Sequence, residues 1–238
     1  MNWLERVMLY IILFPVVFLS NLKAKENKKN VLLIMVDDLN NYAFDGHPDK
    51  IMPHIDNLAE KGVQFTNAFC SSPVCNPSRT ALLTGYRPHV TGHSANSGTR
   101  SGIDDFREIP GFENTVTLPQ YFQKCGYETL DAGKIFHHRN GRLSDDVSWD
   151  IHPDLGQGAN SGSKVYKPSN HSEFSPNSTQ DFENTGDFAN ADFVADYIRQ
   201  DHDKPFFAAC GIFRPHLPWY APREFFDQWE VEDIDIPI

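Results

Sequence analysis

Positive charge is scarce in this sequence, which carries 21 Lys and Arg residues against 32 Asp and Glu residues, for a formal net charge of −11. An acidic chain is repelled by the phosphates of nucleic acids and by anionic lipid surfaces. We therefore expect neither nucleic acid nor an anionic membrane to be its main partner. An anionic ligand would have to be attracted locally, by a bound cation and a few clustered basic side chains.

Apolar runs of membrane-spanning length are also missing. The longest run, Val7–Leu19, follows Arg6 and is shorter than the roughly 20 residues that a bilayer-spanning helix needs. Leu22–Ala24 then ends in a small residue, so residues 1–24 have the pattern of a signal peptide, with a retained anchor as the alternative. We expect the mature chain, residues 25–238, to be periplasmic or secreted and to have no stable membrane association.

Cysteine is the third shortage. The sequence has 4 cysteines, namely Cys70, Cys75, Cys125 and Cys210. An exported chain with four cysteines can form two disulfides. Cys70 and Cys210, however, follow small and aromatic residues that are typical of strand interiors, so buried thiols are the expectation.

The remaining chain alternates buried-strand and helix patterns, which predicts one α/β domain. The expected strands are Val31–Val36, Val63–Cys70, Tyr127–Leu130 and Pro205–Phe213, and the expected helices are Met52–Gly62, Leu118–Gly126, Phe188–Arg199 and one starting in Ala221–Trp229. Residues 140–185 are dense in Ser, Asn, Gly, Pro and Asp. This composition predicts a long surface insertion.

Two adjacent acids follow the first predicted strand. Val31–Val36 is continuously apolar and ends at Asp37 and Asp38. Ligands of open α/β sheets bind outside the carboxyl ends of the strands, and paired carboxylates are hard-cation ligands. The chain leaves the strand here, so both side chains can turn to one ion.

The segment from Pro73 to Gly85 reads P-V-C-N-P-S-R-T-A-L-L-T-G. Pro77 and the helix formers after it place Cys75 at or beside a helix N-terminus. Free N–H groups and the helix dipole favour negative charge there, both on a deprotonated nucleophile and on the oxygens of a sulfate or phosphate. Arg79 lies four residues on, so on a helix it shares a face with Cys75 and can clamp an oxyanion.

This segment resembles the signature of the type I sulfatases of the alkaline phosphatase superfamily, C-x-P-S-R followed by L-T-G. The matching positions are Cys75, Pro77, Ser78, Arg79, Leu83, Thr84 and Gly85. The resemblance implies an α/β fold with a mostly parallel mixed sheet flanked by helices. It also implies that a formylglycine-generating enzyme oxidises Cys75 to formylglycine (3-oxoalanine), and that Asp37, Asp38 and residue 75 bind Ca²⁺.

Two further motifs are similar to those of iduronate-2-sulfatase-like members. G-K-I-F-H contains Lys134 and His137, and R-P-H-L-P contains His216. The resemblance implies that Lys134 binds a sulfate oxygen and that His137 holds and relays protons, with His138 as the less favoured alternative. It implies that His216 donates to the leaving-group oxygen or to sulfate. Basic residues of the loop after Gly85 are candidates for the pocket rim: His89, His93 and Arg100.

Together these residues predict a sulfuric ester hydrolase that acts on a sulfated sugar or polysaccharide. The resemblance covers only the N-terminal part of the family's domain, so we expect this chain alone to bind calcium weakly and to turn over little. One alternative is a phosphatase or phosphonate hydrolase of the same superfamily. The others are a hydrolase that uses Cys75 as a thiolate and a catalytically incomplete fragment.

Overall fold

The computed structural model describes residues 28–40, 52–137, 144–153, 155, 182–217, 221–228 and 230. The chain divides into two compact units, Met1–Asn30 and Val31–Ile238, and the fold described here is that of the second. The predicted signal peptide, His138 and most of the predicted insertion lie outside the described residues. No helix within the described ranges has the length and apolar character needed to cross a bilayer.

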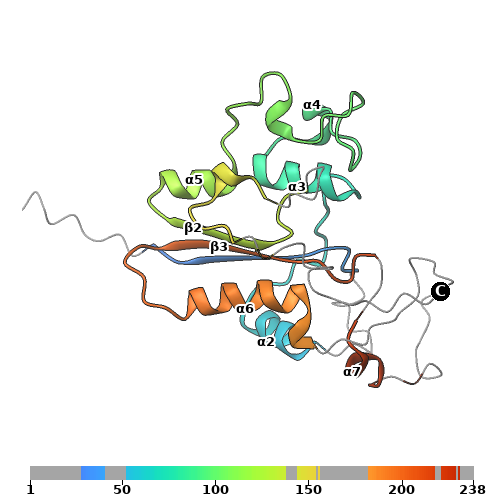
Figure 1. Ribbon diagram of the computed structural model, residues 1–238, viewed down its shortest axis with the longest axis vertical. Helices are drawn as coiled ribbons and strands as arrows, with labels where there is room; N and C mark the ends of the chain where they lie inside the picture. Colours follow the sequence, from blue (N-terminus) through green and yellow to red (C-terminus); the bar gives the residue numbers. More distant parts are fainter. Residues whose placement is uncertain are drawn as a thin grey trace, which may run out of the picture. The chain divides into compact units, whose positions relative to one another are not determined.

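The sheet has three parallel strands in the order β1-β3-β2 (Figure 1). They are β1 (Val31–Val36), β2 (Glu128–Gly133) and β3 (Phe206–Ile212). Val36 pairs with Ile212 and Gly133 pairs with Gly211, so the carboxyl ends of all three strands meet at one edge. This arrangement confirms the expected α/β fold with a parallel sheet.

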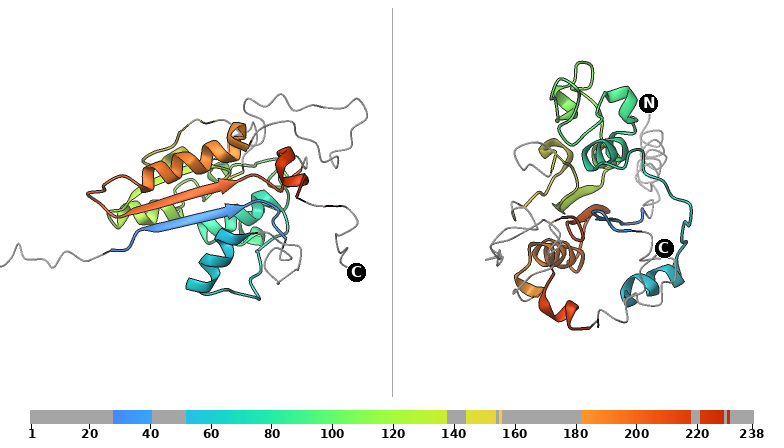
Figure 2. Two further views of the ribbon diagram at one scale, coloured as in Figure 1. Left: turned by 90° about the horizontal axis from the view of Figure 1, so that it is seen from below. Right: turned by 90° about the vertical axis from the view of Figure 1, so that its right-hand side faces the viewer.

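Helices lie on both sides of the sheet (Figures 1 and 2). On one side are α3 (Cys75–Thr84) and α5 (Leu118–Lys124), and on the other is α6 (Gly186–Ile198). The shorter elements are α2 (Pro53–Lys61), α4 (Pro88–Thr91), α7 (Arg223–Phe226) and the 3₁₀ turns at Phe106–Glu108, Asp146–Ser148 and Phe182–Asn184. The expected helices are thus present, with ends shifted by a few residues.

Local sequence explains where these helices begin and end. Thr117 and Gln120 form a reciprocal capping box at the start of α5. The Thr185 hydroxyl accepts a hydrogen bond from the N–H of Phe188 at the start of α6. Gly85 ends α3 in the left-handed conformation with φ 77°, which glycine adopts without steric cost.

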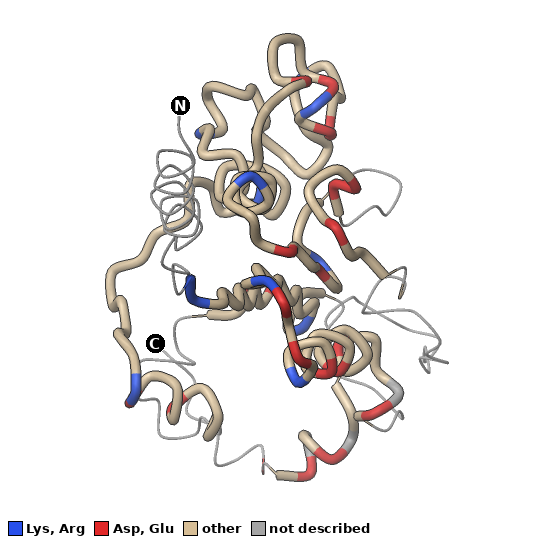
Figure 3. The backbone as a smooth tube through the Cα atoms, turned by 90° about the vertical axis from the view of Figure 1, so that its left-hand side faces the viewer, with Lys and Arg blue, Asp and Glu red and all other residues tan. Residues whose placement is uncertain are grey.

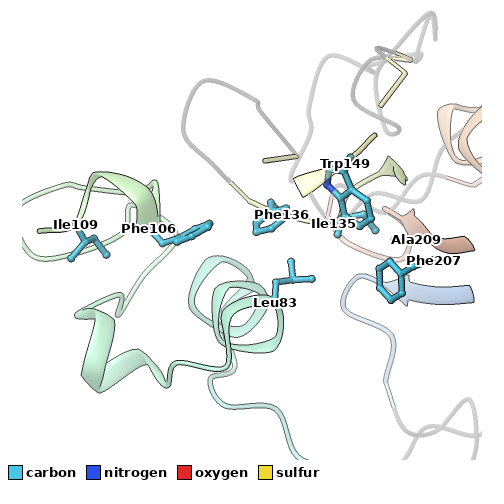
Figure 4. Close-up of a cluster of buried hydrophobic side chains, with 8 residues drawn as sticks. All are labelled: Leu83, Phe106, Ile109, Ile135, Phe136, Trp149, Phe207 and Ala209. Carbon is cyan, nitrogen blue, oxygen red and sulfur yellow. The ribbon is translucent and has the colours of Figure 1, made fainter. Parts of the chain in front are cut away.

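Each face of the sheet carries its own apolar core. Between the sheet and the α3–α5 side lies the cluster of Figure 4: Leu83, Phe106, Ile109, Ile135, Phe136, Trp149, Phe207 and Ala209. Its aromatic rings include two stacked pairs, Phe106 with Phe136 and Trp149 with Phe207. The second cluster joins the sheet to α6: Leu130, Ala132, Val194, Tyr197, Phe206, Ala208 and Cys210. The first core packs α3 against one face of the sheet through Leu83, and the second packs α6 against the other face.

Three expectations for the strands are corrected. Val63–Cys70 forms no strand, and Phe69 is 90% exposed, because within the described residues no strand pairs with this segment. Cys70 is accordingly exposed rather than buried. β1 is not buried on both faces, since Ile34 is 54% exposed at the end of the sheet order. β2 continues through Asp131–Gly133, beyond the predicted strand end at Leu130, because these residues pair with β3.

Candidate active site

Cys75 is the first residue of α3 and follows the extended residue Val74. Its predicted place at a helix N-terminus is therefore confirmed. Arg79, one turn further on, is 5% exposed and reaches the same cluster of side chains. The thiol Sγ lies 3.6 Å from Oδ1 of Asp37 and 3.8 Å from Nζ of Lys134.

Asp37 and Asp38 lie at the end of β1, and both carboxylates are near His216. The N–H of Asp37 still donates to the carbonyl of Ile212 at 3.0 Å, whereas Asp38 has φ 59°, a left-handed conformation that aspartate tolerates. Oδ2 of Asp37 and Oδ2 of Asp38 lie 4.0 and 3.9 Å from the same atom, Nε2 of His216. Both carboxylates thus lie near His216, but the group of ligand atoms within 4.8 Å of one another contains Asp37, Cys75 and His216 and not Asp38.

Two buried cations contact the Asp37 carboxylate. Arg79 Nη2 donates to Oδ1 at 2.8 Å, and Lys134 Nζ donates to Oδ2. All three side chains are nearly inaccessible, with 6% or less exposed. Arg79 and Lys134 together balance the charges of Asp37 and Asp38, so a bound divalent cation would give the cluster the positive charge that an anionic ester needs.

The surroundings shift the pKa values of Asp37 and Cys75 in opposite directions. Burial alone would raise the pKa of Asp37, but the charge of Arg79 and hydrogen bonds from Lys134 and Arg79 outweigh it and hold that pKa below its ordinary value. Burial is the main cause that raises the pKa of the Cys75 thiol; the charge of Lys134 opposes this effect, and the charges of Asp37 and Asp38 add to it. The raised pKa disfavours the thiolate form of Cys75.

Two glycines allow Lys134 to reach this cluster. β2 ends at Gly133 with φ 80°, and the N–H of Lys134 donates to the carbonyl of Gly211 at 3.2 Å. A side-chain carbon on Gly133 would lie 2.0 Å from the Gly211 oxygen, and one on Gly211 would lie 2.2 Å from the Lys134 oxygen. The close backbone contact turns the carbonyls of Lys134 and Ile135 toward Nη1 of Arg79.

His216 is oriented by the turn that follows β3. Its Nδ1 lies 2.6 Å from the carbonyl of Leu217, and its own carbonyl accepts from Nη1 of Arg214 at 2.6 Å. The ring packs edge-on against Phe213, whose face also lies 4.6 Å from Nζ of Lys134. These contacts direct Nε2 toward the two carboxylates.

Asp187 is a positioning residue that the sequence did not reveal. It lies in the first turn of α6, and its carboxylate accepts from the N–H groups of Phe213 at 2.8 Å and Arg214 at 2.9 Å. The turn that carries His216 is thus tied to the helix beneath the sheet. An acid in the first turn of a helix is ordinary, so no local signal in the sequence marks this role.

We expect Asp187→Asn to displace His216 while the chain stays folded. The amide keeps one acceptor and places a donor against the second N–H, so the turn loses one charge-assisted bond and about 1–2 kcal/mol of stability. The measurement is NMR of the His216 ring, which should shift and broaden. Asp192→Asn, on the exposed side of the same helix, is the matched control. An unchanged His216 signal in Asp187→Asn would contradict the positioning role.

His137 lies beside this cluster, three residues after Lys134. Its Nδ1 is buried and has no hydrogen-bond partner in the described part of the chain. Burial, together with the charge of Lys134, lowers the pKa of His137 to about 4. The imidazole is therefore neutral at neutral pH and able to accept a proton.

The low pKa of His137 should make stability depend on pH. Between the ordinary pKa of 6.5 and about 4, the unfolded chain binds a proton that the folded chain does not, so the free energy of unfolding falls as pH falls through this window. His137→Gln should flatten that part of the curve in urea unfolding at a series of pH values. His54→Gln, on the exposed surface of α2, should retain the wild-type slope. Equal slopes for His137→Gln and wild type would rule out this explanation.

A pocket of about 380 Å³ opens beside these residues and is lined by Asp37, Asp38, Cys75 and Arg79, among others. The structure thus brings together six predicted site residues: the side chains of Cys75, Arg79, Lys134 and His216 each lie within 4.0 Å of the Asp37 carboxylate, and His137 lies alongside. Asp37, Cys75 and His216 have ligand atoms within 4.8 Å of one another. The rim candidates His89, His93 and Arg100 do not line this pocket.

Comparison with known proteins shows similarity to sulfatases. The family model described as "Sulfatase" matches residues 29–234. A "Sulfatase" of Formosa agariphila is 31% identical over 229 residues, covering 89% of this chain and 44% of that protein. The iduronate 2-sulfatase of Mus musculus is 32% identical over 226 residues, covering 87% of this chain and 38% of that protein.

Among solved structures, the phosphonate monoester hydrolase of Agrobacterium radiobacter has a TM-score of 0.60 at 19% identity, covering 88% of this chain and 45% of that one. At this identity the similarity concerns the fold alone. The chain spans less than half of the length of each of these three proteins.

Proposed function

Since the chain belongs to the sulfatase family, we propose that it serves the hydrolysis of sulfuric esters on a sulfated sugar or polysaccharide. The observation that carries this proposal is the cluster around Asp37. A candidate nucleophile position, two buried cations and a histidine meet there at the carboxyl edge of a parallel sheet. This is where α/β folds bind their ligands.

Calcium suits the donors at this edge. Asp37 and Asp38 offer hard carboxylate oxygens at the end of β1, each within about 4 Å of Nε2 of His216, and Ca²⁺ prefers six to eight oxygen ligands. We propose that these two residues and residue 75 hold the ion. When bound, calcium supplies positive charge that draws the sulfate oxygens and polarises the ester.

The nucleophile is proposed to be formylglycine made from Cys75 by a formylglycine-generating enzyme. Its hydrated aldehyde supplies one hydroxyl to attack sulfur and a second hydroxyl through which sulfate is later released. The raised pKa of the Cys75 thiol supports this assignment over a thiolate nucleophile, because a thiolate needs a lowered pKa. The half-buried place of Cys75 at the start of α3 directs residue 75 toward Asp37 and Lys134.

The remaining side chains bind charge and move protons. Arg79 and Lys134 would neutralise charge that develops on the sulfate oxygens, which is the electrostatic effect that dominates many enzymes. Nε2 of His216 lies about 4 Å from the carboxylates of Asp37 and Asp38 and would donate a proton to the leaving alcohol. His137, neutral because of its lowered pKa, would accept a proton from residue 75 as sulfate leaves.

The substrate class is proposed from the relatives. The mouse relative is named for sulfate at position 2 of iduronate, and the motifs around His137 and His216 are of the same kind. A sulfated sugar acid or polysaccharide is therefore the favoured substrate. We also propose that residues 1–24 direct the chain to the periplasm or the exterior, where such polymers are found.

A phosphonate or phosphate ester hydrolase is the second candidate, because the phosphonate monoester hydrolase shares this fold. We expect the chain, produced together with a formylglycine-generating enzyme and assayed with Ca²⁺, to cleave 4-nitrophenyl sulfate at least about tenfold faster than the phosphate or the phenylphosphonate. Single-turnover release of nitrophenol measures all three reactions. A faster reaction with the phosphonate would favour the second candidate.

A further inference from the structure

A second, larger pocket adjoins the first. It has a volume of about 820 Å³, within the range of roughly 300–1,000 Å³ that ligand pockets occupy. Ser72 and Pro73 line both pockets. Because the same two residues form a wall of each, a single extended ligand can lie in both.

The lining of the second pocket is rich in hydroxyl groups and basic side chains. Its polar and basic residues are Ser71, Ser72, His89, His93, Ser94, Thr99, Arg100 and Ser101. No acidic side chain is among the described residues that line it. Arg100 matters because the chain as a whole is acidic and its basic positions form only short, separate segments of the described backbone (Figure 3). This chemistry suits a ligand that carries both hydroxyl groups and negative charge.

Hydrogen bonds connect the wall of this pocket to the start of α3. The N–H of Asn76, the residue after Cys75, donates to Oδ1 of Asn96 at 3.0 Å, and its side-chain amide donates to the carbonyl of Asp104 at 3.0 Å. Asn76 is fully buried. The loop that bears Arg100 is therefore held directly against the helix turn that bears Cys75.

The loop itself has a fixed path. The N–H of Thr99 donates to the carbonyl of Ile103 at 2.8 Å, and the N–H of Ser94 donates to the carbonyl of Gly98 at 3.2 Å. Gly98 has φ 86°, and a side-chain carbon there would lie 1.8 Å from the Ile103 oxygen. The pocket is thus formed by a tightly packed turn rather than by a loose excursion of the chain.

We propose that this second pocket binds the neighbouring anionic sugar of a sulfated polysaccharide, with Arg100 and His89 contacting its sulfate or carboxylate group. The ester to be cleaved then lies at Cys75, and the chain of sugars passes Ser72 and Pro73. The inference rests on the proposed function and deepens it, since it makes a polymer rather than a single sulfated sugar the ligand. It also assigns a binding role to the predicted rim residues, which line the second pocket and not the first.

The test is isothermal titration of the chain with a heparin-derived tetrasaccharide and, separately, with inorganic sulfate. Arg100→Gln is compared with Arg87→Gln, an exposed arginine of the same loop that does not line the pocket. A charge-assisted hydrogen bond at an exposed site supports a loss of about fivefold to tenfold in tetrasaccharide affinity for Arg100→Gln. Arg87→Gln should bind as wild type, and the affinity for inorganic sulfate should be the same in all three proteins.

Three outcomes would overturn the inference: equal losses in the two variants, an unchanged affinity in Arg100→Gln, or no binding of the tetrasaccharide at all. Failure of the proposed function looks different. In that case 4-nitrophenyl sulfate is not cleaved and Cys75 stays unmodified, whatever the effect of Arg100→Gln. A tetrasaccharide affinity that falls in Arg100→Gln and not in Arg87→Gln supports the second pocket, even where inorganic sulfate binds too weakly to measure.

Discussion

Replacing Asp37 by asparagine is expected to lower the free energy of unfolding by about 3–5 kcal/mol, the cost of removing one partner from a buried ion pair. The change keeps the shape of the side chain but leaves Arg79 and Lys134 buried beside a neutral amide. Both cations are nearly inaccessible to water, so solvent cannot replace the lost charge. Urea unfolding with a shared m-value measures the difference.

Asp38→Asn is the matched control. Asp38 is the adjacent residue, its side chain is 52% exposed, and asparagine tolerates its positive φ as aspartate does. Its substitution should change stability by no more than about 0.5 kcal/mol. Similar losses in the two variants would show that the pairing of Asp37 with Arg79 and Lys134 does not stabilise the fold.

The Asp37 contribution should also depend on pH in a defined direction. The pKa of Asp37 is held below its ordinary value of 3.8, so its stabilising effect is complete above that value. It is lost as pH falls from there through the pKa of the folded state. The difference between wild type and Asp37→Asn should therefore shrink in this acidic range.

Cys75→Ala is expected to lower the rate of sulfate ester hydrolysis by about a thousandfold or more, because it removes the nucleophile and not only a contact. In the wild-type chain the peptide that contains residue 75 should show the mass of an aldehyde in place of the thiol. Mass spectrometry and nitrophenol release from the same preparation test both statements. An active preparation with an unmodified thiol would exclude the formylglycine mechanism.

The variant Cys75→Ser distinguishes the attack on sulfur from the later release of sulfate. A serine hydroxyl can attack sulfur and expel the alcohol, but it has no second hydroxyl, so sulfate remains esterified to the side chain. We expect at most one equivalent of nitrophenol and a peptide heavier by one SO₃ group. Cys125→Ala, at the C-terminus of α5, is the control and should turn over as wild type. Multiple turnovers in Cys75→Ser would contradict the proposed role of the second hydroxyl.

The sequence predicted much of this site because strand ends and helix starts are local features. The apolar run before Asp37 and the proline after Cys75 each fixed one element, and the parallel topology brings their ends together. Lys134 and His216 were found through motifs that resemble those of iduronate-2-sulfatase-like members, and each motif follows a predicted strand. His137 lies beside them as expected, while its proton-relay role stays a proposal.

Features that depend on distant contacts were not predictable. Val63–Cys70 has strand-like residues, but a strand needs a pairing partner, and none is present among the described residues. The predicted strand ended at Leu130, yet pairing with β3 extends β2 through Asp131–Gly133. Asp187 acts across 26 residues of sequence separation. No local pattern encodes that contact.

The contact between Gly133 and Gly211 limits how this scaffold can be engineered. Any larger residue at either position would push β2 away from β3, and both the ammonium of Lys134 and the carbonyls that hold Arg79 would move with it. Libraries aimed at new ester specificity should therefore leave these two positions invariant and diversify the loop around Arg100. Substitutions at Gly133 or Gly211 would displace Lys134 and Arg79, and with them anion binding, before they changed the selectivity for the ester.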